Sequence, residues 1–320
     1  MALRIASRGL PVQSTRLPMR KAFLRILLAL FAGGLALIVI GVAGARAPVT
    51  VARYTVHAAG MHCTSRPFRV VVMGDLHVSS LTARPEMIRQ AVDKANALRP
   101  DLVVMVGDYF SQWWPTDDAG RLAGLRPLAG LRPRIGTFAI LGNNDISDGA
   151  EQISAILSRV GVKPLVNDAY VAPEVAVMGV AEITSNTANP VLVEERYAGK
   201  LATTRTPPPP LTIWLAHNPL MIERMGSTGD MLFTGHTHGG QILPGLTVPL
   251  IHTVIALGRG LGFDIGWPAE RYVRGFYRNG PKRMIVTSGI GTSGPPLRLG
   301  VPPEIMLVNF TGCPGGGSIR

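Results

Sequence analysis

Seven polar side chains follow short apolar segments of this chain, each near the point where the apolar segment stops. They are Asp75, His77, Asp108, Asn143, His217, His236 and His238. In open α/β sheets the carboxyl ends of the strands form the ligand crevice, so such side chains converge from distant parts of the sequence. Carboxylate, imidazole and amide ligands without cysteine suit divalent ions such as Mn, Fe or Zn. The pattern therefore predicts a site for divalent metal ions.

Each motif alone also has a simpler explanation. An aspartate after a buried strand is often a helix cap or a turn residue, and Gly142 to Asp145 taken alone would be a turn. A single histidine such as His217 is more often a core or surface residue than a ligand. The segment GHTHGGQ at 235–241 is harder to explain by packing, because two alternate histidines are flanked by glycines. Together the motifs are far more specific than any one of them.

The elements that must position these side chains can be predicted from the hydrophobic pattern. Continuous apolar runs predict buried strands, and apolar residues at helical spacing predict helices at 85–98 and 153–160. The expected strands are 68–73, 102–106, 137–141, 175–180, 211–216, 231–234, 284–287 and 305–309. Residues 189–210, which end in four prolines, are expected to form a loop. Strands alternate with helices early and dominate late, so we expect an α/β protein whose sheets are covered by helices on their outer faces.

The N-terminal part of the chain predicts a membrane anchor. Residues 26–45 contain no charged side chain, and twenty helical residues cross a hydrocarbon core of about 30 Å. Six basic residues precede this segment and predict a cytoplasmic N-terminus, with the catalytic domain on the periplasmic or extracytoplasmic side of a bacterial inner membrane. A cleaved signal peptide, with Ala43 and Ala45 before the cut, is the alternative.

The expected organisation follows from these segments. Residues 1–25 form a basic cytoplasmic N-terminus, 26–45 a transmembrane helix or uncleaved signal anchor, and 46–67 a linker with room for an edge strand. Residues 68–311 form one catalytic domain, and 312–320 a flexible tail. Cys63 and Cys313 either form one disulfide or remain two free thiols.

Composition limits the partners. Hydrophobic residues make up 47% of the chain and charged residues 16%, which argues against disorder. The net charge is +12, but the basic residues are scattered or lie before the apolar segment, without the basic and aromatic stripe of a nucleic-acid surface. We therefore expect no specific nucleic-acid partner and a mild preference for phosphates or lipid headgroups.

The ordered motifs GDLH at Gly74, GD at Gly107, GNND at Gly142, AHNP at Ala216 and GHTHGGQ at Gly235 resemble those of the calcineurin-like metallophosphoesterases. The later segments RYVRGFY, SGIGTSGPPLR and PEI resemble the bacterial, membrane-associated subgroup that includes the YkuE and YaeI phosphodiesterases. The resemblance implies two packed mixed β-sheets flanked by helices, a four-layer αββα sandwich, preceded here by the transmembrane helix.

The resemblance also implies roles for the candidate residues. Asp75, His77, Asp108 and His238 would hold one divalent ion, and Asp108, Asn143, His217 and His236 the other. Asp108 would bridge the two ions, and a hydroxide shared by them would attack phosphorus. The implied catalytic residues are Asn144, Asp108 and His217. The expected activity is hydrolysis of phosphodiester or phosphoanhydride bonds at the membrane, with phosphomonoesterase activity as the alternative.

Asn144 is the one departure from the family pattern, which usually has histidine at this position. Asparagine donates a hydrogen bond but cannot deliver a proton near neutral pH. Either the leaving group is already a weak base, or another group such as His252 supplies the proton, or the enzyme is slow. The bacterial UDP-diacylglucosamine hydrolases also depart from histidine there, so a lipid-linked or nucleotide-lipid substrate is a further candidate. A metal-binding protein without catalysis is the non-enzyme alternative.

Trp113 and Trp114 follow the second metal motif, in a loop with Tyr109 and Phe110. They would form an apolar lid over a lipid, insert into the membrane interface, or form a small hydrophobic cluster under the loop.

Overall fold

The structure is a computed structural model of the whole chain. It describes residues 16–63, 66–111, 117–183, 186–204, 207–226, 229–242 and 271–312, with the side chains of residues 16–20 excepted. Trp113, Trp114, His252, Cys313 and the expected tail from residue 313 lie outside the described residues. The other cysteine, Cys63, is disulfide-bonded.

One sheet of the described part carries the first three candidate motifs. Its strand order is β1-β12-β2-β3-β4-β5, and all neighbours are parallel except β12 and β2. The strands are β1 (Thr50–His57), β2 (Phe68–Met73), β3 (Leu102–Met105), β4 (Gly136–Ala139), β5 (Lys163–Pro164) and β12 (Glu304–Thr311). The central strands read as β-branched apolar runs because both of their faces are buried.

The second six-stranded sheet of the described part carries the histidine motifs. Its order is β10-β11-β9-β8-β7-β6, with parallel pairs from β11 to β7 and an antiparallel pair at each edge. The strands are β6 (Asp168–Val171), β7 (Ala176–Gly179), β8 (Thr212–Leu215), β9 (Met231–Thr234), β10 (Gly275–Asn279) and β11 (Lys282–Val286).

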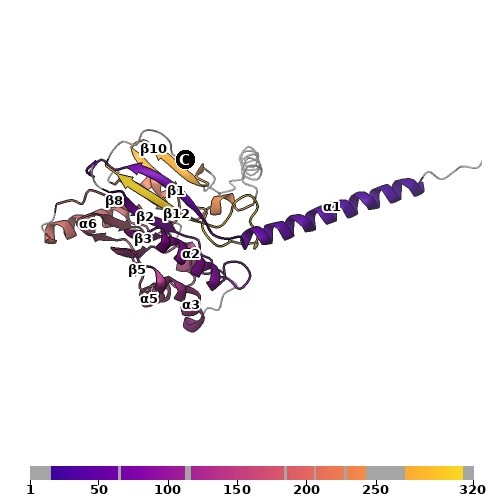
Figure 1. Ribbon diagram of the computed structural model, residues 1–320, viewed down its shortest axis with the longest axis horizontal. Helices are drawn as coiled ribbons and strands as arrows, with labels where there is room; N and C mark the ends of the chain where they lie inside the picture. The colour runs from indigo at the N-terminus through magenta and orange to yellow at the C-terminus, as the bar shows by residue number, and fades with distance from the viewer. Residues whose placement is uncertain are drawn as a thin grey trace, which may run out of the picture. The chain divides into compact units, whose positions relative to one another are not determined.

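Alternate side chains of the strands divide the core into three apolar layers. In β2, Val70 and Val72 pack toward the second sheet, whereas Val71 and Met73 pack toward the helices. The outer layer of the first sheet includes α2 (Pro85–Ala97), α3 (Asp118–Leu125), the 3₁₀ helix η1 (Arg126–Gly130) and α5 (Ala150–Arg159). The outer layer of the second sheet includes α6 (Pro190–Thr204) and α7 (Met221–Arg224). The result is the expected four-layer αββα arrangement, and Figure 1 labels several of its strands and helices.

Two connecting segments can be compared with the expectations. Residues 46–67 contain the edge strand for which they left room, because β1 pairs in parallel along its whole length with β12, so the sheet begins at Thr50, before the expected start of the domain at Phe68. Residues 189–210 are not a loop, because α6 occupies Pro190–Thr204. Pro190 at the first helical position needs no N–H partner, and the Asn189 side chain accepts a hydrogen bond from the Leu192 N–H at 2.9 Å.

The N-terminal helix α1 spans Arg16–Ala45, as the apolar segment predicted. Its portion Lys21–Ala45 is long and apolar enough to cross a membrane, although a signal sequence would satisfy the same criteria. The chain consists of two compact units, Met1–Ile40 and Gly41–Arg320. The last residues of α1, from Gly41 onward, therefore belong to the same unit as the two sheets. Within that unit, the Arg298 N–H donates a hydrogen bond to the Gly41 carbonyl at 2.8 Å.

Candidate metal centre

The candidate ligands occupy tight turns directly after the buried strands. Five of them, Asp75, His77, Asp108, His236 and His238, have φ between 36° and 72°. Residues other than glycine seldom adopt this left-handed conformation, and such strain clusters at functional sites. The turns point side chains from β2, β3 and β9 into one region, because each strand ends at the same edge of its sheet.

Glycines beside the ligands allow the turns to pack closely. A Cβ on Gly235 would lie 2.2 Å from Oδ2 of Asp75, and one on Gly142 would lie 2.1 Å from Oδ1 of Asp108. These distances are far below any real Cβ contact. The glycines in GNND and GHTHGGQ are therefore required by the approach of the two carboxylates.

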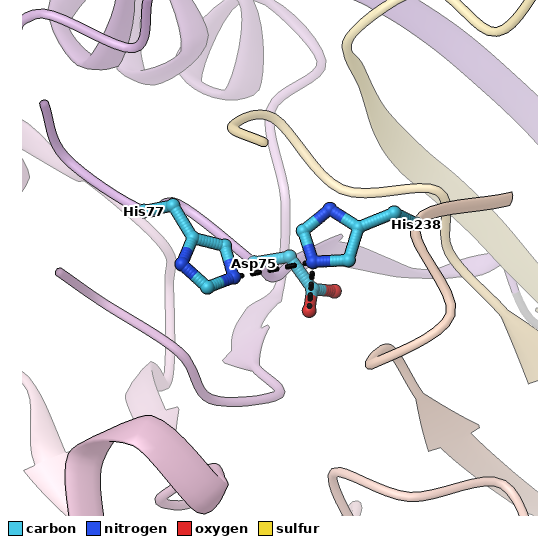
Figure 2. A group of neighbouring side chains, drawn as sticks. All are labelled: Asp75, His77 and His238. Atoms are coloured by element: carbon cyan, nitrogen blue, oxygen red, sulfur yellow. Dashed lines mark hydrogen bonds and ion pairs between the residues drawn. The ribbon is translucent and has the colours of Figure 1, made fainter. Parts of the chain in front are cut away.

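Asp75, His77 and His238 form the first group, which Figure 2 shows. The Nε2 atoms of His77 and His238 are 3.1 Å apart, and Nε2 of His238 lies 3.5 Å from Oδ1 of Asp75. The Asp75 carboxylate accepts the His236 N–H, at 3.0 Å to Oδ1 and 3.2 Å to Oδ2. Two imidazole nitrogens and one carboxylate oxygen thus face a common point, and all three side chains are buried.

Asp108 lies beside the first group and beside a second one. Its Oδ2 atom is 3.4 Å from Nε2 of His77 and 3.3 Å from Nε2 of His217. Nε2 of His217 is in turn 3.2 Å from Nδ1 of His236, and Nδ1 of His217 lies 2.7 Å from the Val106 carbonyl oxygen. Within the described residues, Asp75, Asp108 and His217 also have ligand atoms within 4.8 Å of one another. The two aspartates therefore lie between the two pairs of imidazoles.

Asn143 is the first residue of α4 (Asn143–Ser147) and follows Gly142, whose backbone touches Asp108. Its Oδ1 atom is buried and has no hydrogen-bond partner in the described part of the chain. Nδ1 of His238 is also buried and has no hydrogen-bond partner among the described residues. Buried polar atoms without partners are rare and call for an explanation such as an ion.

The buried carboxylate and imidazole groups of the cluster shift one another's pKa values. Burial would lower the pKa of His217, but Asp108 raises it well above the ordinary value. Burial would likewise raise the pKa of Asp108, but His217 and His77 hold it well below the ordinary value. The Asp108 carboxylate and the His217 imidazole thus favour each other's charged forms.

Two of the other three imidazoles, those of His236 and His238, have lowered pKa values and are neutral at pH 7. Burial lowers the pKa of His236 to about 4, and burial and His77 lower that of His238 well below the ordinary value. Burial raises the pKa of Asp75 to about 6. Neutral imidazoles present lone pairs, which is the state that metal coordination needs.

Asn144 contacts Asp108 directly. Its side-chain Nδ2 donates to Oδ2 of Asp108 at 2.7 Å, and its backbone N–H donates to Oδ1 at 3.1 Å. The residue that replaces the usual histidine therefore holds the carboxylate that lies between the imidazole pairs.

Two residues that support the cluster were not assigned a role from the sequence. The buried Asp145 carboxylate accepts the N–H groups of Asp108, Gly142 and Tyr109 at 2.8, 2.8 and 2.9 Å. The buried Arg298 guanidinium donates to four backbone carbonyls, those of Ser288, Gly289, Gly291 and Val301. Asp145 is the last residue of GNND, and Arg298 is the last of SGIGTSGPPLR. Their positions within these motifs were the sequence features that could have indicated a supporting role.

Comparison with known proteins places this site in context. The family model described as calcineurin-like phosphoesterase matches residues 68–240. Phosphodiesterase YaeI of Escherichia coli K12 is 29% identical over 254 residues, covering 76% of this chain and 82% of that protein. An uncharacterized metallophosphoesterase of Helicobacter pylori J99 is 27% identical over 249 residues, covering 77% of this chain and 60% of its own.

The similarity extends to an animal protein. A bovine transmembrane protein with metallophosphoesterase domain is 27% identical over 224 residues, covering 64% of this chain and 48% of that protein. The chain thus spans about three fifths of the length of the Helicobacter relative and about half of the bovine one.

Proposed function

Because the chain belongs to the calcineurin-like phosphoesterase family, we propose that it is a metal-dependent hydrolase of phosphodiester or phosphoanhydride bonds that acts at a membrane. The position of Asp108 is the observation that carries the proposal. Its Oδ2 atom lies 3.4 Å from Nε2 of His77 in one imidazole pair and 3.3 Å from Nε2 of His217 in the other. The name of the Escherichia coli relative supports a phosphodiester rather than a monoester substrate.

We assign the two metal positions as follows. Asp75, His77, Asp108 and His238 would hold one divalent ion, and Asp108, Asn143, His217 and His236 would hold the other. Asp108 would be shared, because its Oδ2 atom faces both His77 and His217. Asp75 also lies near the second group, but both of its oxygens accept the His236 N–H, so we assign it to the first ion only.

The residues present fit divalent ions. Imidazole nitrogens lie 3.1 and 3.2 Å apart in the two pairs, the buried Asn143 oxygen has no partner in the described part, and the strand-end glycines leave no room for other side chains. Manganese, iron and zinc all suit this mixture of oxygen and nitrogen ligands. When bound, two such ions would activate a water molecule and offset negative charge on the phosphoryl oxygens.

The chain's own residues hold these groups in place. The Val106 carbonyl fixes the His217 ring through Nδ1, which leaves Nε2 facing Asp108. Asn144 anchors the Asp108 carboxylate and stands where the family usually has histidine. Because an amide cannot release a proton near neutral pH, Asn144 would stabilise charge by hydrogen bonding and leave the leaving group unprotonated.

The test is metal content and turnover of the full chain in detergent. The protein should bind close to two manganese, iron or zinc ions and hydrolyse bis(p-nitrophenyl) phosphate. Asp108→Ala should abolish turnover and lower the metal content while the circular dichroism spectrum stays the same. Asp93→Ala, at an exposed position of α2, is the matched control. A chain that stays free of metal after reconstitution, or an Asp108→Ala variant that keeps most of its rate, would contradict the proposal.

We further propose that α1 anchors the enzyme in a bacterial inner membrane with the catalytic unit on the periplasmic side. Support comes from the apolar length of Lys21–Ala45, the basic residues before it and the similarity to a bovine transmembrane protein with metallophosphoesterase domain. An alkaline phosphatase reporter fused after Arg320 should be active, because this reporter works only outside the cytoplasm. Activity of a cytoplasmic reporter at the same position would reverse the orientation.

A further inference from the structure

A small cavity of about 190 Å³ opens beside the metal cluster. The residues that line it include His77, Phe110, Asn144, Asp148, Thr292 and Ser293. Since His77 and Asn144 both contact Asp108, a molecule in this cavity would lie directly next to a phosphoryl group bound at the cluster. The cavity is therefore placed to receive the group attached to that phosphate.

Three buried hydroxyl groups form a chain that ends at the cavity. The Ser79 and Thr82 oxygens are 3.3 Å apart, and the Thr82 and Thr292 oxygens are 3.2 Å apart. The three side chains are between 3% and 6% exposed. None of them belongs to the proposed metal ligands.

The surroundings of Ser79 fix the direction of the hydrogen bonds in this chain. Oγ of Ser79 accepts the N–H groups of Leu81 and Thr82, both at 3.0 Å, which occupies both of its lone pairs. The Ser79 hydroxyl hydrogen is then donated to Thr82, and Thr82 donates its own hydrogen to Thr292. The Thr292 oxygen accepts the hydrogen bond from Thr82, so the Thr292 hydroxyl hydrogen can be donated to a group in the cavity.

The charges around the cavity indicate what kind of group it accepts. No lysine or arginine is among the described residues that line it, whereas Asp148 contributes a carboxylate. That carboxylate makes no hydrogen bond or ion pair with any other described residue. A second phosphate placed here would be repelled by the Asp148 carboxylate and would meet no lysine or arginine among the described lining residues, which disfavours a phosphoanhydride. An uncharged group with hydroxyls would find a donor in Thr292 and an acceptor in Asp148.

We propose that this cavity binds an uncharged, hydroxyl-bearing alcohol portion of a phosphate ester, such as a glycerol unit, and that Thr292 donates a hydrogen bond to it. The inference rests on the proposed function and narrows its substrate class toward esters of small polyols. The cavity volume of about 190 Å³ is large enough for a group of that size.

The experiment measures binding of two probes, sn-glycerol 3-phosphate and inorganic phosphate, to the full manganese-loaded chain in detergent by calorimetry. Thr292→Val keeps the shape of the side chain and removes its hydroxyl. The affinity for glycerol 3-phosphate should therefore fall by about 3- to 10-fold, the effect of one neutral hydrogen bond. Inorganic phosphate should bind as before. Thr292→Ser should restore binding, and Thr82→Val, which removes the donor that orients Thr292, should cause a smaller loss.

Thr137→Val, at a buried threonine of β4, is the matched control and should change neither probe. The inference would be overturned if Thr292→Val bound glycerol 3-phosphate as tightly as the parent chain does. It would also be overturned if the variant lost affinity for both probes by the same factor. The same holds if the parent chain prefers inorganic phosphate to glycerol 3-phosphate. Because binding is measured without turnover, a parent chain that binds both probes as expected but hydrolyses no ester would contradict only the proposed function.

Discussion

Arg298 and Gly291 are joined by two hydrogen bonds inside the catalytic unit, from Nε and Nη2 of the guanidinium to the Gly291 carbonyl at 3.0 and 2.5 Å. The Gly291 N–H donates in turn to the Asp75 carbonyl at 2.7 Å, and a Cβ on Gly291 would lie 2.8 Å from that of His77. Burial lowers the pKa of Arg298 to about 10, so the guanidinium stays charged at neutral pH. Arg298 thus holds the segment that packs against two proposed metal ligands.

Replacing Arg298 should therefore weaken the metal site as well as the fold. Arg298→Met removes the donors to four buried carbonyls, and the expected loss of stability is on the order of 2 to 4 kcal/mol. Manganese affinity should fall about ten-fold, because the turn at Asp75 and His77 loses its support. Urea unfolding and metal titration measure the two effects, with the exposed Arg89→Met as control. A variant that loses stability but keeps its metal affinity would show that Arg298 serves the fold alone.

Asp145 should behave as a positioning residue for Asp108. Its carboxylate accepts three backbone N–H groups, and burial and the neighbouring Asp108 raise its pKa to about 7. Asp145→Asn replaces one acceptor oxygen by an amide that must face an N–H donor, so we expect a loss of about 2 kcal/mol and weaker metal binding. Asp118→Asn, in the exposed first turn of α3, is the control for thermal unfolding and metal titration. Unchanged metal affinity in Asp145→Asn would contradict the positioning role.

The layered fold could be predicted from the sequence because its main signals are local. The apolar run 68–73 and the run 231–234 coincide with β2 and β9, since strands buried on both faces need an unbroken apolar pattern. Strand ends also identified the polar residues that the structure brings together, because parallel strands align their carboxyl ends.

Features that depend on distant partners could not be predicted in the same way. The sequence left room for an edge strand in 46–67, but the bounds of β1 follow from its pairing with β12, about 250 residues later in the chain, as in the pair Thr50 and Glu304. Asp145 resembles any aspartate in a turn until its three N–H donors are seen. The partners of Arg298 are backbone carbonyls, which carry no sequence signal.

A pH-dependent contribution to stability is expected from Asp101, at the start of β3 and away from the metal cluster. Burial would raise its pKa, but hydrogen bonds from Arg66, the Arg69 N–H and Arg134 hold it below the ordinary value. A carboxylate whose folded pKa is lowered stabilises the protein above its unfolded pKa of about 4, and the contribution disappears as pH falls through the folded pKa.

Asp101→Asn should therefore cost stability at pH 7 and progressively less below about pH 4. The loss at pH 7 should be about 1 to 2 kcal/mol, because both arginine side chains are partly exposed and solvent weakens their attraction. Urea unfolding of the parent and the variant between pH 3 and pH 7 measures the difference. A difference that stays constant across this range would mean that packing, and not ionisation, accounts for the effect.

The hydrogen bond from Asn144 to Asp108 leads to a prediction about the leaving group. If Asn144 stabilises charge but releases no proton, the departing oxygen carries its developing charge without acid catalysis. The rate should then depend steeply on the pKa of the leaving group. A series of phosphodiesters with graded leaving groups, assayed with the full chain at fixed metal occupancy, gives kcat/KM for each.

Asn144→His places an imidazole where the family usually has one and should flatten that dependence. Alkyl esters should gain about 10- to 100-fold and p-nitrophenyl esters little, at the low end of general-acid effects because the surrounding residues are not arranged for the new ring. Metal content should be measured in parallel, since the substitution also removes the amide donor to Asp108 at 2.7 Å. Asn144→Ala removes the same donor without adding an acid, so it separates the two effects. Parallel, shallow plots for the parent and Asn144→His would mean that another group already supplies the proton, and Asn144 would then be left with the single task of holding the Asp108 carboxylate.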